Sequence, residues 1–378
     1  MKYFSLFLSA FLFIGCSMLQ PKPRVLKLDK QWIRSTYDTP YNGYRRAHQM
    51  NPVLMDDMVL QGNAIDGLAA FHKTTGRQLW RIDIQNGVAS GAQAFDDKLY
   101  FGGSDGQFYC VDAYTGRLIW TQPTRMENLS PPLVENGVVY FLSGNDHLFA
   151  LDAKTGKQKW VYTRTNSTEL SVRGGSRPVL VQNTLYIGFS DGYLVAVHIK
   201  DGSVAWERQI NTNPRFKDID STPVIIGNTI YVSGYDNALY ALSRADGQVL
   251  WRLEEGSSFP VTIAGNRLYQ STSQNTLRAI NTTTGQIIWS RGISHGISTQ
   301  PMLYKEYLIY GESDGSLVIA DPTNGNLIKS YQPGQGVSSS PTIDTGTGYI
   351  YFISNEGNLH SLKLHWARDD QVPNYRIL

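Results

Sequence analysis

Apolar and polar residues alternate along this chain in short runs, and pairs of turn-forming residues separate the runs. The stretch 222–254, TPVIIGNTIYVSGYDNALYALSRADGQVLWRLE, shows the pattern in full. Its four apolar segments (PVII, IYVSG, ALYAL and VLWRL) are separated by Gly-Asn, Asp-Asn and Asp-Gly pairs. Such pairs supply the positive φ angles that tight hairpin turns need. The stretch therefore predicts four short antiparallel strands.

The end of this unit, YALSRADGQVLW (240–251), recurs along the chain. Its copies are AAFHKTTGRQLW (69–80), YCVDAYTGRLIW (109–120), FALDAKTGKQKW (149–160), VAVHIKDGSVAW (195–206), RAINTTTGQIIW (278–289) and VIADPTNGNLIK (318–329). The glycines of successive copies are 38 to 46 residues apart. A period of about 40 to 45 residues with strand patterning is typical of propeller blades. The repeats predict an all-β fold, a β-propeller of four-stranded antiparallel blades.

A tryptophan ends six of the copies, and Lys329 takes its place in the last one. We interpret the indole as structural, packed between neighbouring blades. A stack for binding a ligand is the alternative, but a binding site does not need to be repeated in every blade.

The two ends of the chain complete the count of blades. Trp32, in KQWIRST, precedes any complete unit, whereas the C-terminal segment YIYFISNEGNLHSLKL (349–364) lacks a final strand. We predict that the Trp32 strand pairs with the C-terminal blade and closes a ring of eight blades, which removes the exposed sheet edges. The predicted propeller spans residues 31–365, and a tail, 366–378, follows it.

The N-terminus carries the features of an export signal. Lys2 precedes the apolar run FSLFLSAFLFIG, which is too short to span a membrane, and Cys16 follows Gly15 directly. We therefore assign residues 1–15 to a signal peptide. The Gly-Cys junction resembles the bacterial lipobox, which implies a lipidated Cys16 at the start of a flexible tether, residues 16–30. Because Ser17 replaces the aspartate that retains lipoproteins in the inner membrane, the resemblance implies an outer-membrane anchor on the periplasmic face.

Charge and cysteine content exclude other classes of protein. The 34 Lys and Arg residues nearly balance the 32 Asp and Glu residues, which leaves a net charge of +2 and no sign of a nucleic-acid partner. Besides Cys16 the chain has one cysteine, Cys110, within the strand-like segment QFYCVDA. We expect Cys110 to be a small buried core residue.

Two connections between blades are longer than the others. From the final-strand Trp to the Pro that opens the next blade there are 18 residues after Trp160 and 17 after Trp206, against 9 to 12 in three other blades. Equivalent loops of a propeller emerge on one face, so these two are neighbours. Long loops on a rigid scaffold are where binding residues concentrate.

The first long loop, within ELSVRGGSRP (169–178), contains Leu170, Val172 and Arg173, and the second contains Asp218 and Asp220. An apolar pair beside an arginine and two carboxylates is typical of a protein-binding patch. Alternatively, Arg173 ties down the neighbouring loop through Asp218 or Asp220. The sequence leaves both possibilities open.

The tandem DAxTGxxxW units resemble the quinoprotein-type propeller repeat. Together with the lipobox, the length and the loop motifs LSVR and DID, they resemble the BamB family, the lipoprotein subunits of the outer-membrane β-barrel assembly machinery. That resemblance implies a scaffold whose loops contact the periplasmic POTRA domains of BamA, through Leu170, Val172, Arg173, Asp218 and Asp220. It also implies membership of the assembly complex and a role in inserting outer-membrane proteins.

Catalysis is the main competing hypothesis, because quinoprotein dehydrogenases carry the same repeat. Those enzymes use an adjacent Cys-Cys pair, which this sequence lacks. The recurrent aspartates of the blades are explained by turn formation, and Asp146-His147 by a solvated turn; these aspartates are Asp105, Asp191, Asp236 and Asp314. We therefore expect no enzyme activity, cofactor or metal. A ligand in the central channel is a further alternative, which the small apolar innermost strands (PPLV, RPVL, TPVI, QPML) do not favour.

Overall fold

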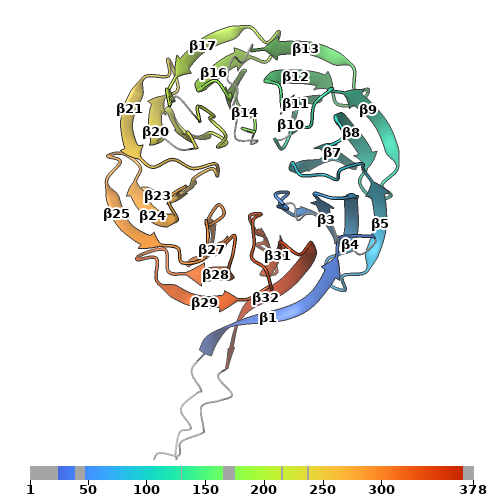
Figure 1. Cartoon of the computed structure of the whole chain (residues 1–378), viewed down its shortest axis with the longest axis vertical. Coiled ribbons are helices and arrows are strands. Elements are labelled where there is room, and N and C mark those ends of the chain that lie inside the picture. The colour runs from blue at the N-terminus through green and yellow to red at the C-terminus, as the bar shows by residue number, and fades with distance from the viewer. Residues whose placement is uncertain are drawn as a thin grey trace, which may run out of the picture.

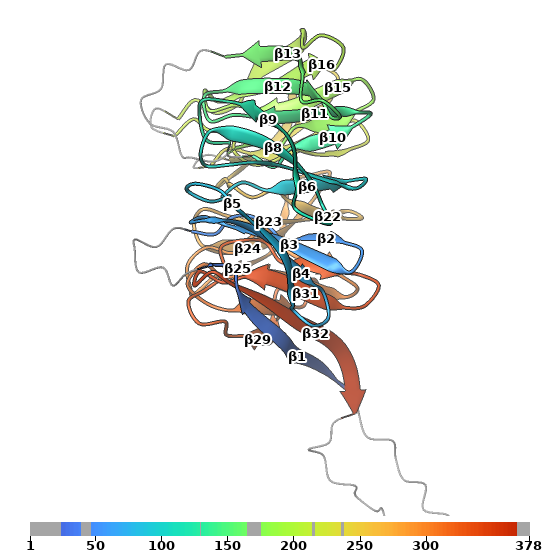
Figure 2. The ribbon, with the colours of Figure 1, turned by 90° about the vertical axis from the view of Figure 1, so that its right-hand side faces the viewer.

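The computed structural model describes residues 24–38, 47–128, 130–164, 175–213, 216–235 and 238–368. The regular elements of these residues are strands, which form eight four-stranded antiparallel sheets. The sheets surround a central axis as blades (Figure 1) and make a disc when seen from the side (Figure 2). The predicted all-β, eight-bladed propeller is confirmed. The described part contains no helix of the length and hydropathy that a membrane span requires.

Seven blades are continuous in sequence, and the chain runs from the innermost to the outermost strand in each of them. The first three consist of β2 (Val53–Met55), β3 (Met58–Asn63), β4 (Gly67–His72) and β5 (Gln78–Asp83); β6 (Ala92–Phe95), β7 (Lys98–Gly102), β8 (Gln107–Asp112) and β9 (Leu118–Pro123); and β10 (Leu133–Glu135), β11 (Val138–Leu142), β12 (His147–Asp152) and β13 (Gln158–Thr163). The next two consist of β14 (Val179–Val181), β15 (Thr184–Gly188), β16 (Tyr193–His198) and β17 (Val204–Gln209); and β18 (Val224–Ile226), β19 (Thr229–Ser233), β20 (Ala238–Ser243) and β21 (Val249–Glu254). The last two consist of β22 (Thr262–Ala264), β23 (Arg267–Ser271), β24 (Thr276–Asn281) and β25 (Ile287–Gly292); and β26 (Met302–Tyr304), β27 (Tyr307–Gly311), β28 (Leu317–Ala320) and β29 (Leu327–Tyr331).

The eighth blade joins the two ends of the chain. Its strands are β30 (Thr342–Asp344), β31 (Tyr349–Ile353), β32 (Asn358–Arg368) and, on the outside, β1 (Arg24–Ser35). Trp32 pairs with Ser361, and the ladder extends from Ser35 opposite Asn358 to Arg24 opposite Arg368. The predicted closure by the Trp32 strand is confirmed.

The ends of the propeller lie outside the predicted limits of 31 and 365. Residues 24–30, which we placed in the tether, and 366–368, which we placed in the tail, belong to the β1–β32 ladder. The reason is the alternation in this segment: Leu26 is buried and Leu28 is half-buried against the core of the last blade, beside Leu364. Strand pairing therefore continues for as long as the apolar alternation does.

The core lies between the blades rather than inside any one of them. The second and third strands of the blades are largely buried on both sides, as in β3, where every residue is buried, whereas outer strands such as β9 are mostly exposed. Cys110 on β8 belongs to this core: it is fully buried, and burial raises the pKa of its thiol to about 12. Its predicted role as a small core residue is confirmed.

A repeated contact fastens neighbouring blades at seven of the eight interfaces. The Trp120 Nε1 donates a hydrogen bond of 3.1 Å to the carbonyl oxygen of Ala153, and the indole lies over Gly156. Gly156 has a φ of +72°, and a Cβ there would lie 2.6 Å from the indole ring. Six more interfaces repeat the pairing of Trp and Gly: Trp32 with Gly76, Trp80 with Gly116, Trp160 with Gly202, Trp206 with Gly247, Trp251 with Gly285, and Trp289 with Gly325. The predicted structural role of the tryptophans is confirmed.

The eighth interface uses a different contact. Lys329 occupies the place of the tryptophan on β29, and its Nζ donates a hydrogen bond of 3.1 Å to the carbonyl oxygen of Leu26 on β1. An amine thus replaces the indole between the seventh and eighth blades.

Candidate functional site

The two long connections join β13 to β14 and β17 to β18, and both belong to neighbouring blades. Leu170, Val172 and Arg173 of the first connection lie outside the described residues, as does Cys16 at the N-terminus. The second connection is described apart from residues 214 and 215. The geometry of the predicted patch therefore rests on the DID segment, 218–220.

The DID segment is buried in the face of the disc that carries these connections. Asp218, Ile219 and Asp220 are 0%, 1% and 7% exposed. The Ile219 N–H donates to the carbonyl oxygen of Phe189 (3.1 Å), and the Tyr235 N–H donates to that of Asp218 (3.2 Å). The segment is thus held between turns of two blades. The two carboxylates are therefore buried within the protein, and their predicted contact with a partner stays a prediction.

Three buried carboxyl groups lie close enough to influence one another. Burial, and then the charges of Asp218 and Asp146, raise the pKa of Asp220 well above its ordinary value. Burial also raises the pKa of Asp146, whose carboxylate accepts hydrogen bonds from the backbone N–H and the hydroxyl of Ser190. The Asp220 Oδ2 accepts a hydrogen bond from no described residue.

Asp146 differs from our interpretation of it as part of a solvated turn. It does lie in the turn between β11 and β12, with a φ of +58°, but it is only 5% exposed. The turn is capped by Ser190 of the next blade, which shields the carboxylate from solvent. A sequence motif for a turn does not reveal what a neighbouring blade places over it.

The recurrent aspartates Asp105 and Asp191 do organise hairpin turns, as predicted. Their Oδ1 atoms accept hydrogen bonds from the N–H two residues later, at 3.1 Å for Asp105 and 3.2 Å for Asp191. Asp191 also forms an ion pair with Arg164, both Nε and Nη2 lying 2.7 Å from its Oδ2. Asp236 lies outside the described residues.

Within the described ranges, no three His, Cys, Asp or Glu side chains are grouped so that they could hold a metal ion.

The buried Asp220 predicts that this chain loses stability as the pH rises. Because its pKa is higher in the folded chain than the ordinary value of about 3.9, folding favours the protonated carboxyl. The stabilisation is complete below about pH 4 and is lost as the pH rises through the folded pKa. Asp220→Asn, which stays neutral, should therefore melt at a higher temperature than the wild type at about pH 8, and the gain should shrink toward about pH 4.

Thermal melting across this pH range checks the prediction, with Asp57→Asn as the matched control. Asp57 is exposed, so its substitution removes the same charge without changing a buried group. A gain in melting temperature that is the same at every pH, or that also occurs in Asp57→Asn, would contradict the assignment.

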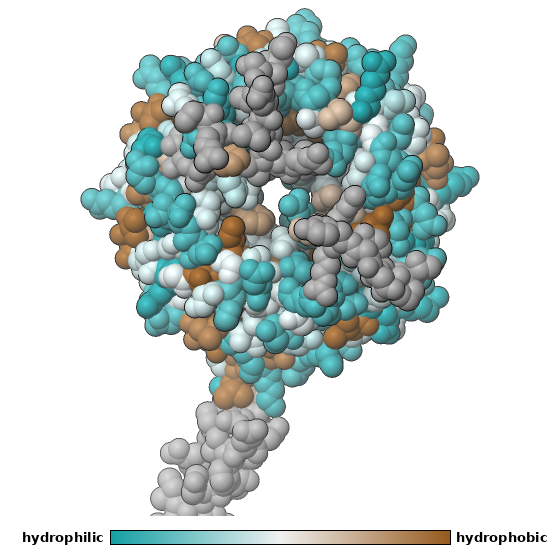
Figure 3. Space-filling model, viewed as in Figure 1, coloured by the Kyte–Doolittle hydropathy of each residue, from teal (hydrophilic) through white to brown (hydrophobic). Residues whose placement is uncertain are grey.

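The central channel is the second candidate site. It has a volume of about 740 Å³ and is open at the middle of the disc in Figure 3. One residue just ahead of the innermost strand of each blade lines it, and we call these eight residues the collar: Asn51, Gly91, Pro131, Arg177, Thr222, Phe259, Gln300 and Ser340. Arg177 is the one ionisable residue of the collar.

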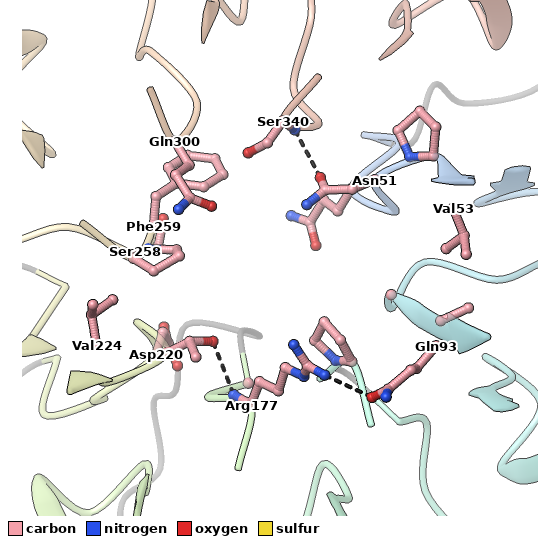
Figure 4. Close-up of a pocket in the computed structure, with 18 of the residues that line it drawn as sticks. Asn51, Val53, Gln93, Arg177, Asp220, Val224, Ser258, Phe259, Gln300 and Ser340 are labelled. Atoms are coloured by element: carbon pink, nitrogen blue, oxygen red, sulfur yellow. Dashed lines mark hydrogen bonds between the residues drawn. The ribbon is translucent and has the colours of Figure 1, made fainter. Parts of the chain in front are cut away.

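The side chain of Arg177 is held in place by two other blades. Its Nε donates to the carbonyl oxygen of Pro132 (3.0 Å), and its Nη2 donates to Oε1 of Gln93 (2.7 Å). Gln93 in turn accepts from and donates to the backbone of Val134. Figure 4 shows the Arg177 side chain extended toward Gln93 at the wall of the opening. Our sequence analysis missed Arg177, although a signal for it existed: each collar residue except Gly91 directly precedes a proline.

Comparison with known proteins identifies the family. The sequence model described as "Outer membrane protein assembly factor BamB" matches residues 66–290 and 227–374, which is most of the chain. The chain belongs to the BamB family. The predicted resemblance to these outer-membrane protein assembly factors is therefore confirmed.

Individual relatives agree with this assignment. The BamB assembly factor of Yersinia pestis is 27% identical over 369 residues, which cover 89% of this chain and 92% of that protein. The match to the BamB of Moranella endobia is 26% identical and spans 50% of this chain and 52% of that protein. The crystal structure of BamB from Moraxella catarrhalis superposes with a TM-score of 0.75 at 21% identity, covering 89% of this chain and 100% of that one.

The enzyme class shares the fold at a lower identity. A quinohemoprotein alcohol dehydrogenase from Comamonas testosteroni has a TM-score of 0.71 at 15% identity, covering 89% of this chain and 76% of that one. This likeness concerns the architecture of the blades alone.

Proposed function

We propose that this chain is a non-catalytic scaffold of the outer-membrane β-barrel assembly machinery, which binds the periplasmic POTRA domains of BamA and assists insertion of outer-membrane proteins. The observation that carries the proposal is its membership of the BamB family, matched from residue 66 to residue 374. The closed ring supports it, because eight blades fastened to one another hold two enlarged neighbouring connections on a rigid base.

Lipidation of Cys16 would fix the ring near its partner. A lipid-anchored protein and a membrane-embedded partner meet at a raised effective concentration, so weak loop contacts suffice for stable assembly. The anchor would face the periplasm from the outer membrane. The mass of the N-terminal peptide tests this part: an unmodified peptide that keeps Met1 would overturn it.

A scaffold needs no reaction chemistry. We propose that the chain binds no quinone, because the sequence lacks the adjacent Cys-Cys pair of the quinoprotein dehydrogenases. Saturable binding of pyrroloquinoline quinone in the presence of calcium, measured by equilibrium dialysis, would contradict the scaffold function.

Arg173→Glu tests the proposed contact with BamA. If Leu170, Val172 and Arg173 form the binding patch, this charge reversal should weaken capture of the POTRA domains by about 2 kcal/mol or more without lowering the melting temperature. The measurement is a titration of purified BamA periplasmic domains against the full-length protein in detergent.

Arg125→Glu provides the matched control. Arg125 is exposed in the connection between β9 and β10, which is the equivalent connection one blade earlier, so the same reversal there should leave capture unchanged. If Arg173→Glu instead lowers the melting temperature and retains capture, Arg173 serves to tie its loop to the buried Asp218 or Asp220. Equal loss of capture in both variants would mean that net charge, and not the loop, determines binding.

A further inference from the structure

The collar of the central channel holds one guanidinium, that of Arg177, whose charge has no paired carboxylate among the described residues. Both recorded acceptors of the Arg177 side chain, Pro132 O and Gln93 Oε1, are neutral. Arg177 makes no ion pair with any carboxylate of the described residues. Asp220, the other ionisable residue that lines the channel, belongs to the carboxyl cluster with Asp218 and Asp146 and forms no ion pair with Arg177.

The guanidinium is nevertheless oriented before any ligand arrives. Its Nε and Nη2 are fixed from two other blades, and its Nη1 donates to no described residue. Gln93, which holds Nη2, is itself fixed at both ends of its amide by Val134. A guanidinium presents pairs of N–H donors that match the two oxygens of a carboxylate.

A purely structural role does not account for a charge at this place. Burial lowers the pKa of Arg177, which means that the channel disfavours the charged form, and among the described residues no carboxylate is paired with it to offset that cost. A neutral glutamine, such as the collar residue Gln300, could join neighbouring blades without that cost. A half-buried cation with neutral partners is stabilised when an anion occupies the space beside it.

We propose that the central channel binds a carboxylate-bearing ligand, with Arg177 pairing the carboxylate and the rest of the collar contacting the body of the ligand. Figure 4 places Asn51, Gln300 and Ser340 around the same opening, where they offer amide and hydroxyl groups, and Phe259 offers an aromatic ring. The volume of about 740 Å³ lies within the range of small-molecule sites. The carboxylate comes from a small free acid or from the C-terminus of an extended peptide.

Three probes separate these sources. Succinate represents a free acid, acetyl-trialanine represents a peptide C-terminus, and acetyl-trialanine amide is the same peptide without the carboxylate. We expect calorimetric binding of at least one carboxylate to the full-length protein, with a rise in melting temperature that grows with ligand concentration. The amide should bind at least about tenfold more weakly than the free peptide.

Arg177→Gln should abolish the ligand-dependent rise in melting temperature, and Arg177→Lys, which keeps the charge but not the fork of donors, should retain part of it. Arg117→Gln is the matched control, since it removes the same charge from an exposed outer position.

Unchanged binding by Arg177→Gln, equal binding of the peptide and its amide, or no binding of either carboxylate to the wild type would overturn the proposal. If Arg177→Gln is unstable, Arg177→Lys still tests the proposal, because it keeps the positive charge and its ligand-dependent rise in melting temperature should be smaller than that of the wild type. The site is independent of the proposed BamA contact, which the Arg173 variant tests separately.

Discussion

Deleting the closing strand β1 is expected to convert the closed ring into a self-associating, less stable protein. A chain that begins at Thr36 lacks the outer strand of the last blade, so β32 keeps β31 as its inner partner and loses its outer partner along its whole length. Unpaired strand edges recruit other chains. The deletion also removes Leu26 from the core of that blade and the Trp32 indole from Gly76, two contacts that join the ends of the ring.

The matched control is a chain that begins at Arg24, which loses every residue before β1 but keeps the complete ladder. Light scattering after size exclusion, together with thermal melting, should show a stable monomer for the Arg24 start and larger species with a lower melting temperature for the Thr36 start. If both chains were monomeric and melted at the same temperature, closure by β1 would not stabilise the ring.

The architecture could be predicted from the sequence because its determinants repeat. The pairing of Trp120 with Gly156 needs an indole at the end of one copy of the repeat and a residue with positive φ in the next copy, and every copy has a glycine four residues before its last position. A period of this kind is visible in a single sequence. The sequence also shows the one copy without a tryptophan, because Lys329 stands in its place. The hydrogen bond from Lys329 to Leu26 could not be predicted.

The first and last residues of the propeller were harder to predict from the sequence, because they depend on pairing between distant segments. Residues 24–30 contain charged side chains and follow two prolines, which favoured a tether. Their strand is formed by the partner, β32, whose ladder reaches Arg368. Local composition does not report a pairing between the first and last strands of a chain.

The candidate site was the least predictable part. The lengths of the two connections identified where the loops are large, but a loop has no period that separates inward from outward side chains. Asp218 and Asp220 are polar and were expected at the surface, yet turns of two neighbouring blades bury them. Arg177 was overlooked for another reason: it begins the segment RPVL, which we treated as small and apolar when we considered the channel, although the residue ahead of the proline lines the opening.

The indole contact between blades should account for a large part of the stability. Trp120→Ala is expected to lower the free energy of unfolding by about 3 kcal/mol, because it removes the ring from Phe108 and Gly156. It also takes one hydrogen bond from the Ala153 carbonyl, which keeps the Tyr100 hydroxyl as a donor. Denaturant unfolding measures the loss. Trp366→Ala is the control, since Trp366 on β32 is 49% exposed, and it should cost much less.

A double-mutant cycle then tests whether the indole and the glycine act as one unit. Gly156→Ala alone should destabilise, because its Cβ would lie 2.6 Å from the Trp120 ring and its φ is +72°. In the Trp120→Ala background the steric part of that cost disappears, and only the backbone strain remains. The two losses should therefore sum to more than the loss in the double variant, by about 1 kcal/mol or more. Strict additivity would show that the indole does not press on the glycine, and that another contact sets the spacing of the blades.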